Sequence, residues 1–131
     1  MNPKSTIVFV CEHGAAKSVL AAAYFEKLAG ELGLDLRAVA RGTNPDTEVS
    51  PQTISGLTED GLAPAERKPQ KLTESDMQSA RRVIAFCDLP VKFQQSFPVE
   101  YWKDVPSVSE NYGQARDIIV EHIYQLLKSS G

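Results

Sequence analysis

The residues best suited to covalent chemistry lie together near the N-terminus, in the segment Cys11-Glu12-His13-Gly14-Ala15-Ala16-Lys17-Ser18. Thiolates are strong nucleophiles, and a helix N-terminus or a nearby cation favours the thiolate form of a cysteine. Gly14 allows a positive φ, and Ala15 and Ala16 are small, so successive backbone N–H groups can turn toward one centre. We therefore expect the amides of residues 12–17 and the charge of Lys17 to bind a tetrahedral anion over Cys11. Ser18 can hydrogen-bond the thiolate, and His13 is expected either to point to the ligand or, preferably, to brace the loop or face solvent.

The pattern around this segment predicts the elements that position it. Residues 7–10 form a short apolar run with β-branched side chains, which is typical of a strand buried on both faces. Residues 18–32 follow with an apolar stripe of helical period, ended by Gly33. Residues 34–40 alternate between apolar and polar side chains, which indicates a second strand. The loop should thus join the carboxyl end of a strand to a helix N-terminus, where anions bind.

The rest of the chain continues the alternation of helices and strands. Ser50-Pro51 and Gly61 predict a helix that ends at Asp60, and Thr73 begins a short helix. Residues 82–87 indicate a buried strand, residues 88–107 are expected to be irregular, and residues 109–128 form a long helix. This order predicts a mainly parallel sheet with helices on both faces.

Composition narrows the functional classes. The chain has 131 residues, of which 42% are hydrophobic and 24% charged, so we expect one domain over residues 1–131. We expect no membrane span and no secretory signal, and hence a cytoplasmic protein. The net charge is −3 and the predicted pI is 5.4. An acidic chain is a poor binder of nucleic acid, which requires a basic face, whereas one positive loop is sufficient for a small anion.

Cysteine usage argues against a disulfide scaffold. Only Cys11 and Cys87 occur, and their separation does not fit a zinc site. We expect no metal and no organic cofactor. Each cysteine is expected to be a free thiol, and by default such a residue, here Cys87 at a strand end, is a small buried side chain.

The arrangement strand, Cys-x5-Lys-Ser, helix resembles the Cys-x5-Arg-Ser loop of the low-molecular-weight phosphotyrosine phosphatases and the thioredoxin-linked arsenate reductases. The resemblance covers most of the chain and includes three further runs: Arg41-Gly42-Thr43-x-Pro45, Arg67-Lys68-Pro69-x-Lys71-Leu72-Thr73 and Tyr101-Trp102-Lys103-Asp104-Val105-Pro106. It implies a three-layer α/β sandwich with a four-stranded parallel sheet.

The chain departs from the family pattern at several positions. Lys17 replaces an arginine, so a point charge stands where the family has a planar fork that binds two oxygens. Gly14 and Ala40 replace the asparagine of the loop and the serine that supports it. Arg41 replaces an alanine, and is expected either to reach the site or, preferably, to be solvated at the strand end. The acidic residue of the family's Asp-Pro pair is Val105 here, so Asp104 lies one residue early.

The resemblance implies three alternative functions. The first is hydrolysis of a phosphotyrosine-type phosphomonoester through a cysteinyl-phosphate on Cys11, with Asp104 as the candidate acid. Asp88, at a strand end, is the alternative acid or, preferably, a cap of a helix or turn. The second is reduction of arsenate, in which Cys87 resolves the intermediate and thioredoxin supplies electrons, although residues 88–96 lack the further thiol of the usual relay. The third is a catalytically weak or inactive relative that binds anions. Phe97, Tyr101 and Trp102 either wall the pocket or cover the sheet edge.

Overall fold

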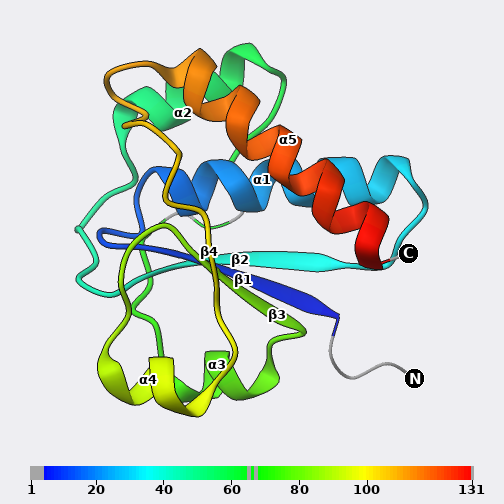
Figure 1. Cartoon of the computed structure of the whole chain (residues 1–131). Coiled ribbons are helices and arrows are strands. Elements are labelled where there is room, and N and C mark those ends of the chain that lie inside the picture. Colours follow the sequence, from blue (N-terminus) through cyan, green and yellow to red (C-terminus); the bar gives the residue numbers. More distant parts are fainter. Residues whose placement is uncertain (1–4, 65, 67, 131) are drawn as a thin grey trace.

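The computed structural model describes residues 5–64, 66 and 68–130, in which strands and helices alternate (Figure 1). The strands are β1 (Thr6–Cys11), β2 (Arg37–Gly42), β3 (Arg82–Ala85) and β4 (Glu100–Tyr101). The helices are α1 (Lys17–Glu31), α2 (Pro51–Glu59), α3 (Glu74–Ser79), α4 (Val91–Ser96) and α5 (Tyr112–Ser130).

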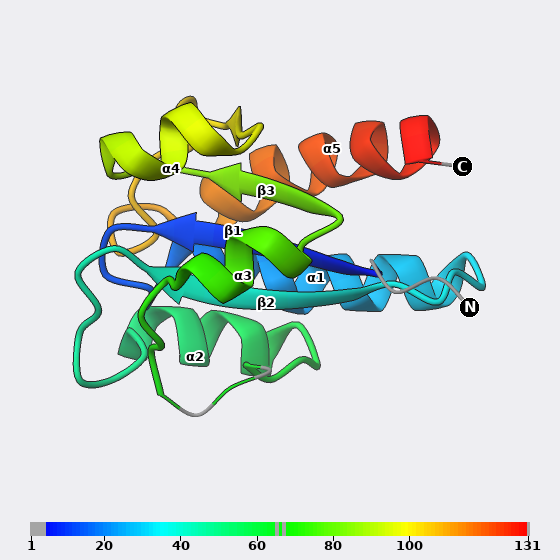
Figure 2. The same cartoon turned by 90° about the horizontal axis from the view of Figure 1, so that it is seen from below.

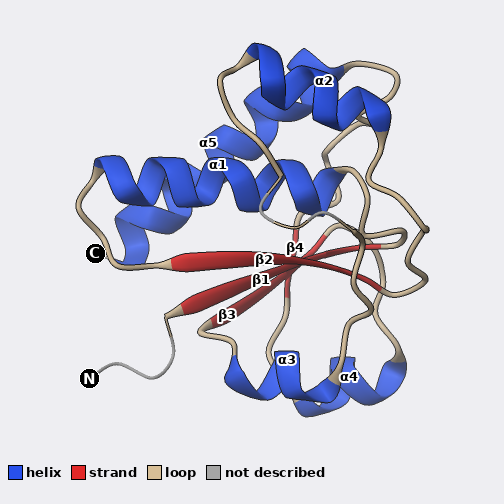
Figure 3. Ribbon diagram, turned by 180° about the vertical axis from the view of Figure 1, so that it is seen from behind, coloured by secondary structure: helices blue, strands red, loops and turns tan. Residues whose placement is uncertain are grey.

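The strands form one parallel sheet in the order β2-β1-β3-β4 (Figure 3). β1 lies in the centre of the sheet and pairs with β2 over its whole length, from Thr6↔Arg37 to Cys11↔Gly42. Parallel strands bring their carboxyl ends to the same edge, so Cys11 lies beside the ends of β2 and β3. The predicted four-stranded parallel sheet is confirmed.

Helices cover both faces of the sheet. α1, α2 and α5 lie on one face and α3 and α4 on the other, the face seen from below in Figure 2 (Figures 1 and 2). Successive side chains of β1 enter two different cores. Ile7, Phe9 and Cys11 pack with α1 and α5, whereas Val8 and Val10 pack with α3 and α4. This alternation follows from the period of two in a strand, and it confirms the three-layer sandwich.

The predicted helix boundaries of the middle region are confirmed. The Ser50 side chain accepts a hydrogen bond from the Thr53 N–H, and Pro51 is the first residue of α2. Thr73 and Asp76 cap α3 reciprocally. The Thr73 hydroxyl accepts a hydrogen bond from the Asp76 N–H, and the Asp76 carboxylate accepts one from the Thr73 N–H. Such caps satisfy backbone donors that have no partner within the helix.

Several predicted boundaries are wrong. β1 is one residue longer at each end, α1 begins and ends one residue earlier, and β3 ends at Ala85 rather than at residue 87. Larger differences occur in β2 and in the last helix. β2 begins at Arg37 rather than at residue 34, because its partner β1 begins at Thr6 and offers no pairing before that point. The last helix begins at Tyr112 rather than at residue 109, because Asn111 is its cap and accepts the Gln114 N–H through its side chain. No helix in the described ranges is long and apolar enough to cross a bilayer.

The segment expected to be irregular contains α4 and the short strand β4. These elements are too short for a periodic pattern, and only Phe93 of α4 is buried. Trp102, directly after β4, is 3% exposed and packs against Phe9 and Phe86. Of the two expected roles, a wall of the pocket or a cover of the sheet edge, Trp102 therefore has the second: it is a core residue at the edge of the sheet.

Candidate active site

Cys11 and Ser18 meet at the junction of β1 and α1. Cys11 is the last residue of the strand and Ser18 the second residue of the helix. The Cys11 Sγ atom lies 3.0 Å from the Ser18 Oγ atom, and Ser18 is completely buried. A hydroxyl at this distance can donate to a thiolate, and the first turn of a helix adds a positive electrostatic potential.

The loop between them turns its carbonyl groups toward the segment that follows β2. The carbonyls of Cys11, Glu12, His13 and Ala15 accept hydrogen bonds from the N–H groups of residues 43, 44, 46 and 50. Each planar peptide points its N–H opposite to its carbonyl, so the N–H groups of residues 12, 13, 14 and 16 are directed the other way. Among the described residues, none accepts a hydrogen bond from these N–H groups. They are free to bind an anion.

The loop and the end of β2 are in direct backbone contact. Gly14 has φ +62°, as predicted, and a Cβ atom there would lie 2.9 Å from the Gly42 nitrogen. A Cβ atom on Gly42 would lie 2.7 Å from the Gly14 nitrogen. Real Cβ atoms do not approach so closely, so both positions require glycine. The contact replaces the asparagine brace of the family pattern with backbone packing.

Cys11 lies on the wall of a pocket of about 430 Å³. The pocket brings together six predicted site residues of the loop, Cys11, Glu12, His13, Ala15, Ala16 and Lys17, and a seventh, Cys87, from a later segment. Its other walls come from later segments: Asp46, Ser50, Phe86, Cys87, Ser107, Val108 and Ser109. A larger hollow of about 630 Å³, between α3 and β4, has no nucleophilic side chain on its walls.

Lys17 is the cation of the pocket. It is the first residue of α1 and is half-buried. In the part of the chain that the structure describes, no carboxylate forms an ion pair with its ammonium group. The charge is therefore available to a bound anion.

Cys87 is the second thiol of the pocket. Both cysteines are free, and Cys87 follows β3 as a half-buried residue. Burial raises the pKa of the Cys87 thiol, and the negative charge of a Cys11 thiolate raises it further. Cys87 is thus held in its neutral thiol form, whereas an attacking cysteine must be a thiolate.

Asp104 lies outside this pocket. Its carboxylate is 2.9 Å from Nε2 of His122, whose ring stacks on Trp102 with centroids 4.6 Å apart. His122 is half-buried and satisfied, as predicted. The segment reaches the pocket only further along, at Ser107 and Val108. The expectation that Asp104 is the acid therefore has no support in this geometry, since its side chain is directed to α5 instead.

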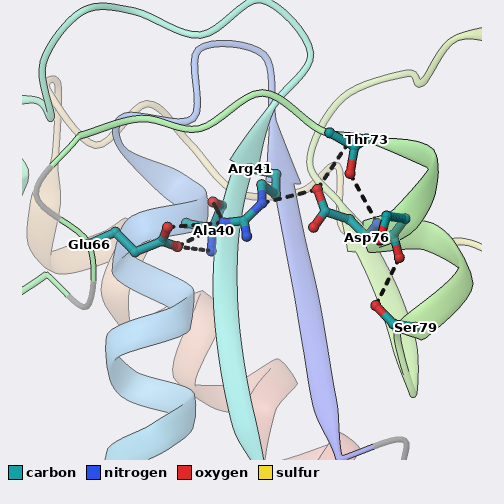
Figure 4. A network of polar contacts seen from close by, with 7 residues as sticks. Ala40, Arg41, Glu66, Thr73, Asp76 and Ser79 are labelled. Atoms are coloured by element: carbon teal, nitrogen blue, oxygen red, sulfur yellow. Dashed lines mark hydrogen bonds and ion pairs between the residues drawn. The ribbon is translucent and has the colours of Figure 1, made fainter.

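Arg41 neither enters the site nor lies in solvent, contrary to both expectations. Its Nε lies 3.0 Å from Asp76 Oδ2, and one terminal nitrogen lies 2.8 Å from Glu66 Oε1 (Figure 4). The side chain is 17% exposed. The same nitrogen donates to the Ala40 carbonyl, so the network joins β2 to α3 and to the segment before it.

The motif from Arg67 to Thr73 is explained in part by the same region. Arg67 itself lies outside the described residues. Lys71 forms a parallel bridge with Gly42, and the Leu72 N–H donates to the Gly42 carbonyl at 2.9 Å. The motif thus holds Gly42 against the loop.

A histidine and two carboxylates form the rim of the pocket. Nδ1 of His13 lies 3.3 Å from Asp46 Oδ1 and 3.4 Å from the Asn44 carbonyl oxygen. Nε2 of the same ring lies 3.9 Å from Glu12 Oε1. The contacts of Nδ1 join His13 to the segment that follows β2. Asp46 and Ser107 were not predicted as pocket residues, although Asp46 directly follows the Gly42-Thr43-x-Pro45 run at the end of β2.

Among the described residues, no group of three or more His, Cys, Asp or Glu side chains is arranged to hold a metal ion. The fold and the pocket define an α/β protein with a cysteine beneath a loop of free backbone donors. Residues 6–117 match the family described as low molecular weight phosphotyrosine protein phosphatase. The chain belongs to this family and is a cysteine-based enzyme of this type.

Solved structures of the same fold include both phosphatases and a reductase. A low molecular weight protein tyrosine phosphatase from Bacillus subtilis is 26% identical, with a TM-score of 0.78 over 94% of this chain and 95% of that chain. The YwlE arginine phosphatase, in a mutant with a phosphorylated active-site serine, is 25% identical, with a TM-score of 0.84 over 95% and 94%. An arsenate reductase from Archaeoglobus fulgidus is 24% identical, with a TM-score of 0.75 over 93% and 98%. The predicted superfamily is confirmed.

Proposed function

We propose that this protein hydrolyses phosphomonoesters of the phosphotyrosine type through a cysteinyl-phosphate on Cys11. The observation that carries the proposal is the 3.0 Å contact between Cys11 Sγ and Ser18 Oγ on the wall of the pocket. Beside this pair, the N–H groups of residues 12, 13, 14 and 16 have no acceptor in the described part of the protein. A phosphate dianion fits such a set of donors.

The reaction has two displacements at phosphorus. In the first, the Cys11 thiolate attacks the phosphorus atom, an S–P bond forms, and the bond to the leaving oxygen breaks. The loop amides and Lys17 stabilise the negative charge on the equatorial oxygens. In the second, water attacks the phosphocysteine, the S–P bond breaks, and phosphate leaves. Ser18 then donates its hydrogen bond to the departing thiolate.

The first test measures release of p-nitrophenol from p-nitrophenyl phosphate. Cys11→Ser should abolish turnover, whereas Cys87→Ser should retain it, because only the first cysteine carries the phosphoryl group. Acid quenching with labelled substrate should trap one phosphoryl group on Cys11. Turnover that survives in Cys11→Ser would refute the proposal.

A second candidate function is arsenate reduction, which is favoured by the presence of both thiols on one pocket wall. Cys11 would attack arsenate and displace water. Cys87 would then attack the Cys11 sulfur, so that a disulfide forms and the electron pair of the S–As bond reduces arsenic to arsenite. Thioredoxin, with its reductase, would restore the two thiols.

The two candidates are separated by Cys87. Arsenate-dependent oxidation of NADPH, coupled through thioredoxin and its reductase, should be lost in Cys87→Ser, while phosphatase activity remains. A wild-type protein that turns over neither substrate, and yet binds phosphate, would refute both enzymatic proposals and favour an anion-binding relative.

A further inference from the structure

A basic leaving oxygen, such as a phenolate, needs a proton as its bond to phosphorus breaks, and the position that the resemblance gives to the acid does not supply one here. The segment around residues 104–109 presents Ser107, Val108 and Ser109 to the pocket, and Asp104 is bound to His122 elsewhere. A proton donor must lie within hydrogen-bond reach of the leaving oxygen. It must therefore be sought among the other residues that line the pocket.

Five titratable side chains line the pocket beside Cys11: Glu12, His13, Lys17, Asp46 and Cys87. Glu12 and Asp46 are more than half exposed and flank the two nitrogens of the His13 ring, so both are placed to pair with the imidazole. Lys17 has the one positive charge suited to the phosphate, and the raised pKa of Cys87 makes its thiol a poor acid. The imidazole is the group that exchanges protons near neutral pH.

The surroundings of His13 fix which ring nitrogen can exchange a proton with a ligand. Nδ1 faces Asp46 Oδ1 at 3.3 Å and the Asn44 carbonyl oxygen at 3.4 Å. Both are acceptors, so Nδ1 carries a hydrogen. Asp46 is held in place because its N–H donates to the His13 carbonyl at 3.0 Å. Nε2 is left on the opposite side of the ring, where Glu12 lies 3.9 Å away.

We propose that His13 is the general acid of the proposed phosphatase reaction and that Asp46 is its positioning residue. This inference rests on the proposed function. In the first displacement, Nε2–H protonates the leaving oxygen as its bond to phosphorus breaks. In the second, the neutral Nε2 takes a proton from the attacking water as the S–P bond breaks. The ring returns to its starting state, so the cycle is balanced with water as the only co-substrate.

The test compares two aryl phosphates that differ in leaving group. Nitrophenolate leaves without protonation much more easily than phenolate does, so loss of the acid should affect phenyl phosphate most. His13→Gln should lower kcat/KM for phenyl phosphate about 100-fold, the usual contribution of a general acid, and much less for p-nitrophenyl phosphate. Asp46→Ala should show the same selectivity with a smaller loss.

His122→Gln is the matched control, because His122 also pairs with an aspartate but does not line the pocket. It should leave both substrates unchanged. The pH profile of kcat/KM gives a second readout: its alkaline limb, which requires a protonated ring flanked by Glu12 and Asp46, should disappear in His13→Gln. Added imidazole should partly restore phenyl phosphate turnover in His13→Ala, which a merely structural defect would not allow.

The outcomes separate the two proposals. Equal losses on both substrates, with the alkaline limb intact and no imidazole rescue, would overturn the role of His13 and leave the phosphatase proposal in place. A leaving-group-dependent loss in Asp104→Asn, with none in His13→Gln, would return the acid to Asp104. A wild-type protein that hydrolyses neither substrate and forms no phosphocysteine would refute the proposed function and this role together.

Discussion

The Cys11 thiol and the Ser18 hydroxyl lie 3.0 Å apart although one ends a strand and the other begins a helix. The contact exists because the intervening loop curls back, so that the first turn of α1 lies beside the end of β1. Because Ser18 is completely buried, no solvent molecule competes for its hydroxyl. In the proposed reaction this hydroxyl stabilises the thiolate both before attack and when it leaves.

Removal of this hydroxyl gives the first prediction. Ser18→Ala should lower kcat about ten- to a hundredfold, because a hydrogen bond to a charged group contributes about 1.5–3 kcal/mol. The larger effect should fall on the second displacement, in which the thiolate departs. Rapid mixing with p-nitrophenyl phosphate should then show a pronounced burst of nitrophenol followed by a slow phase. A slow single phase with no burst would place the effect on the first displacement instead.

The second prediction concerns the cation of the pocket. Lys17→Arg should raise kcat and kcat/KM together, because a bidentate fork binds two equatorial oxygens whose charge is greatest in the transition state. The gain should recover part of the roughly 1.5–3 kcal/mol of a charge-assisted hydrogen bond. Steady-state kinetics on one aryl phosphate measure it. An unchanged or lower kcat, with an intact circular dichroism spectrum, would mean that Lys17 does not limit turnover.

The third prediction is the pH dependence of Cys87. A raised pKa means that the reactive thiolate appears only at more alkaline pH, so iodoacetamide should label Cys87 with a midpoint above that of a small free thiol. Cys11→Ser should lower this midpoint, because the charge of the Cys11 thiolate is one cause of the shift. Mass spectrometry of the labelled peptides measures both. A midpoint at or below that of the small thiol would contradict the burial argument.

The fourth prediction tests the packing of α2 against α5. A Cβ atom on Gly56 would lie 2.2 Å from Cε2 of Tyr112, whose hydroxyl donates to Asp60 at 2.9 Å. Gly56→Ala should therefore lower the free energy of unfolding by about 1–3 kcal/mol, as overpacking does. Gly30→Ala is the control, since that Cβ would meet nothing within 4 Å. It should raise stability by up to about 1 kcal/mol through helix propensity. Urea titration measures both, and equal effects would contradict the packing argument.

The parts of the fold that the sequence predicts are those with strong local signals. The apolar run of β1, the stripe of α1 and the caps Ser50 and Thr73 each specify their element without distant contacts. β4 has only two residues, and its strand character depends on pairing with β3. A pairing partner far along the chain leaves no trace in local periodicity.

In the site, too, local features can be predicted from the sequence and long-range contacts cannot. The loop of residues 11–18 is a local feature, and its glycine and alanines predict its shape. Asp104 could not be placed in this way, because the direction of its side chain depends on His122 of α5. Arg41 takes neither of its expected positions, because its two carboxylate partners lie at positions 66 and 76. Ion pairs of this kind are set by tertiary structure, which spacing alone does not reveal.

The hydrogen bonds between the loop and residues 43–50 have a consequence for folding. Four carbonyls of the loop are fixed by N–H groups that come into place only after β2 has paired with β1. A nascent chain that ends before residue 43 therefore contains Cys11 and Ser18 but lacks the partners that direct the loop amides toward an anion. The reactive thiol therefore joins a complete site only after the tertiary contacts have formed. Until then it is exposed to oxidants.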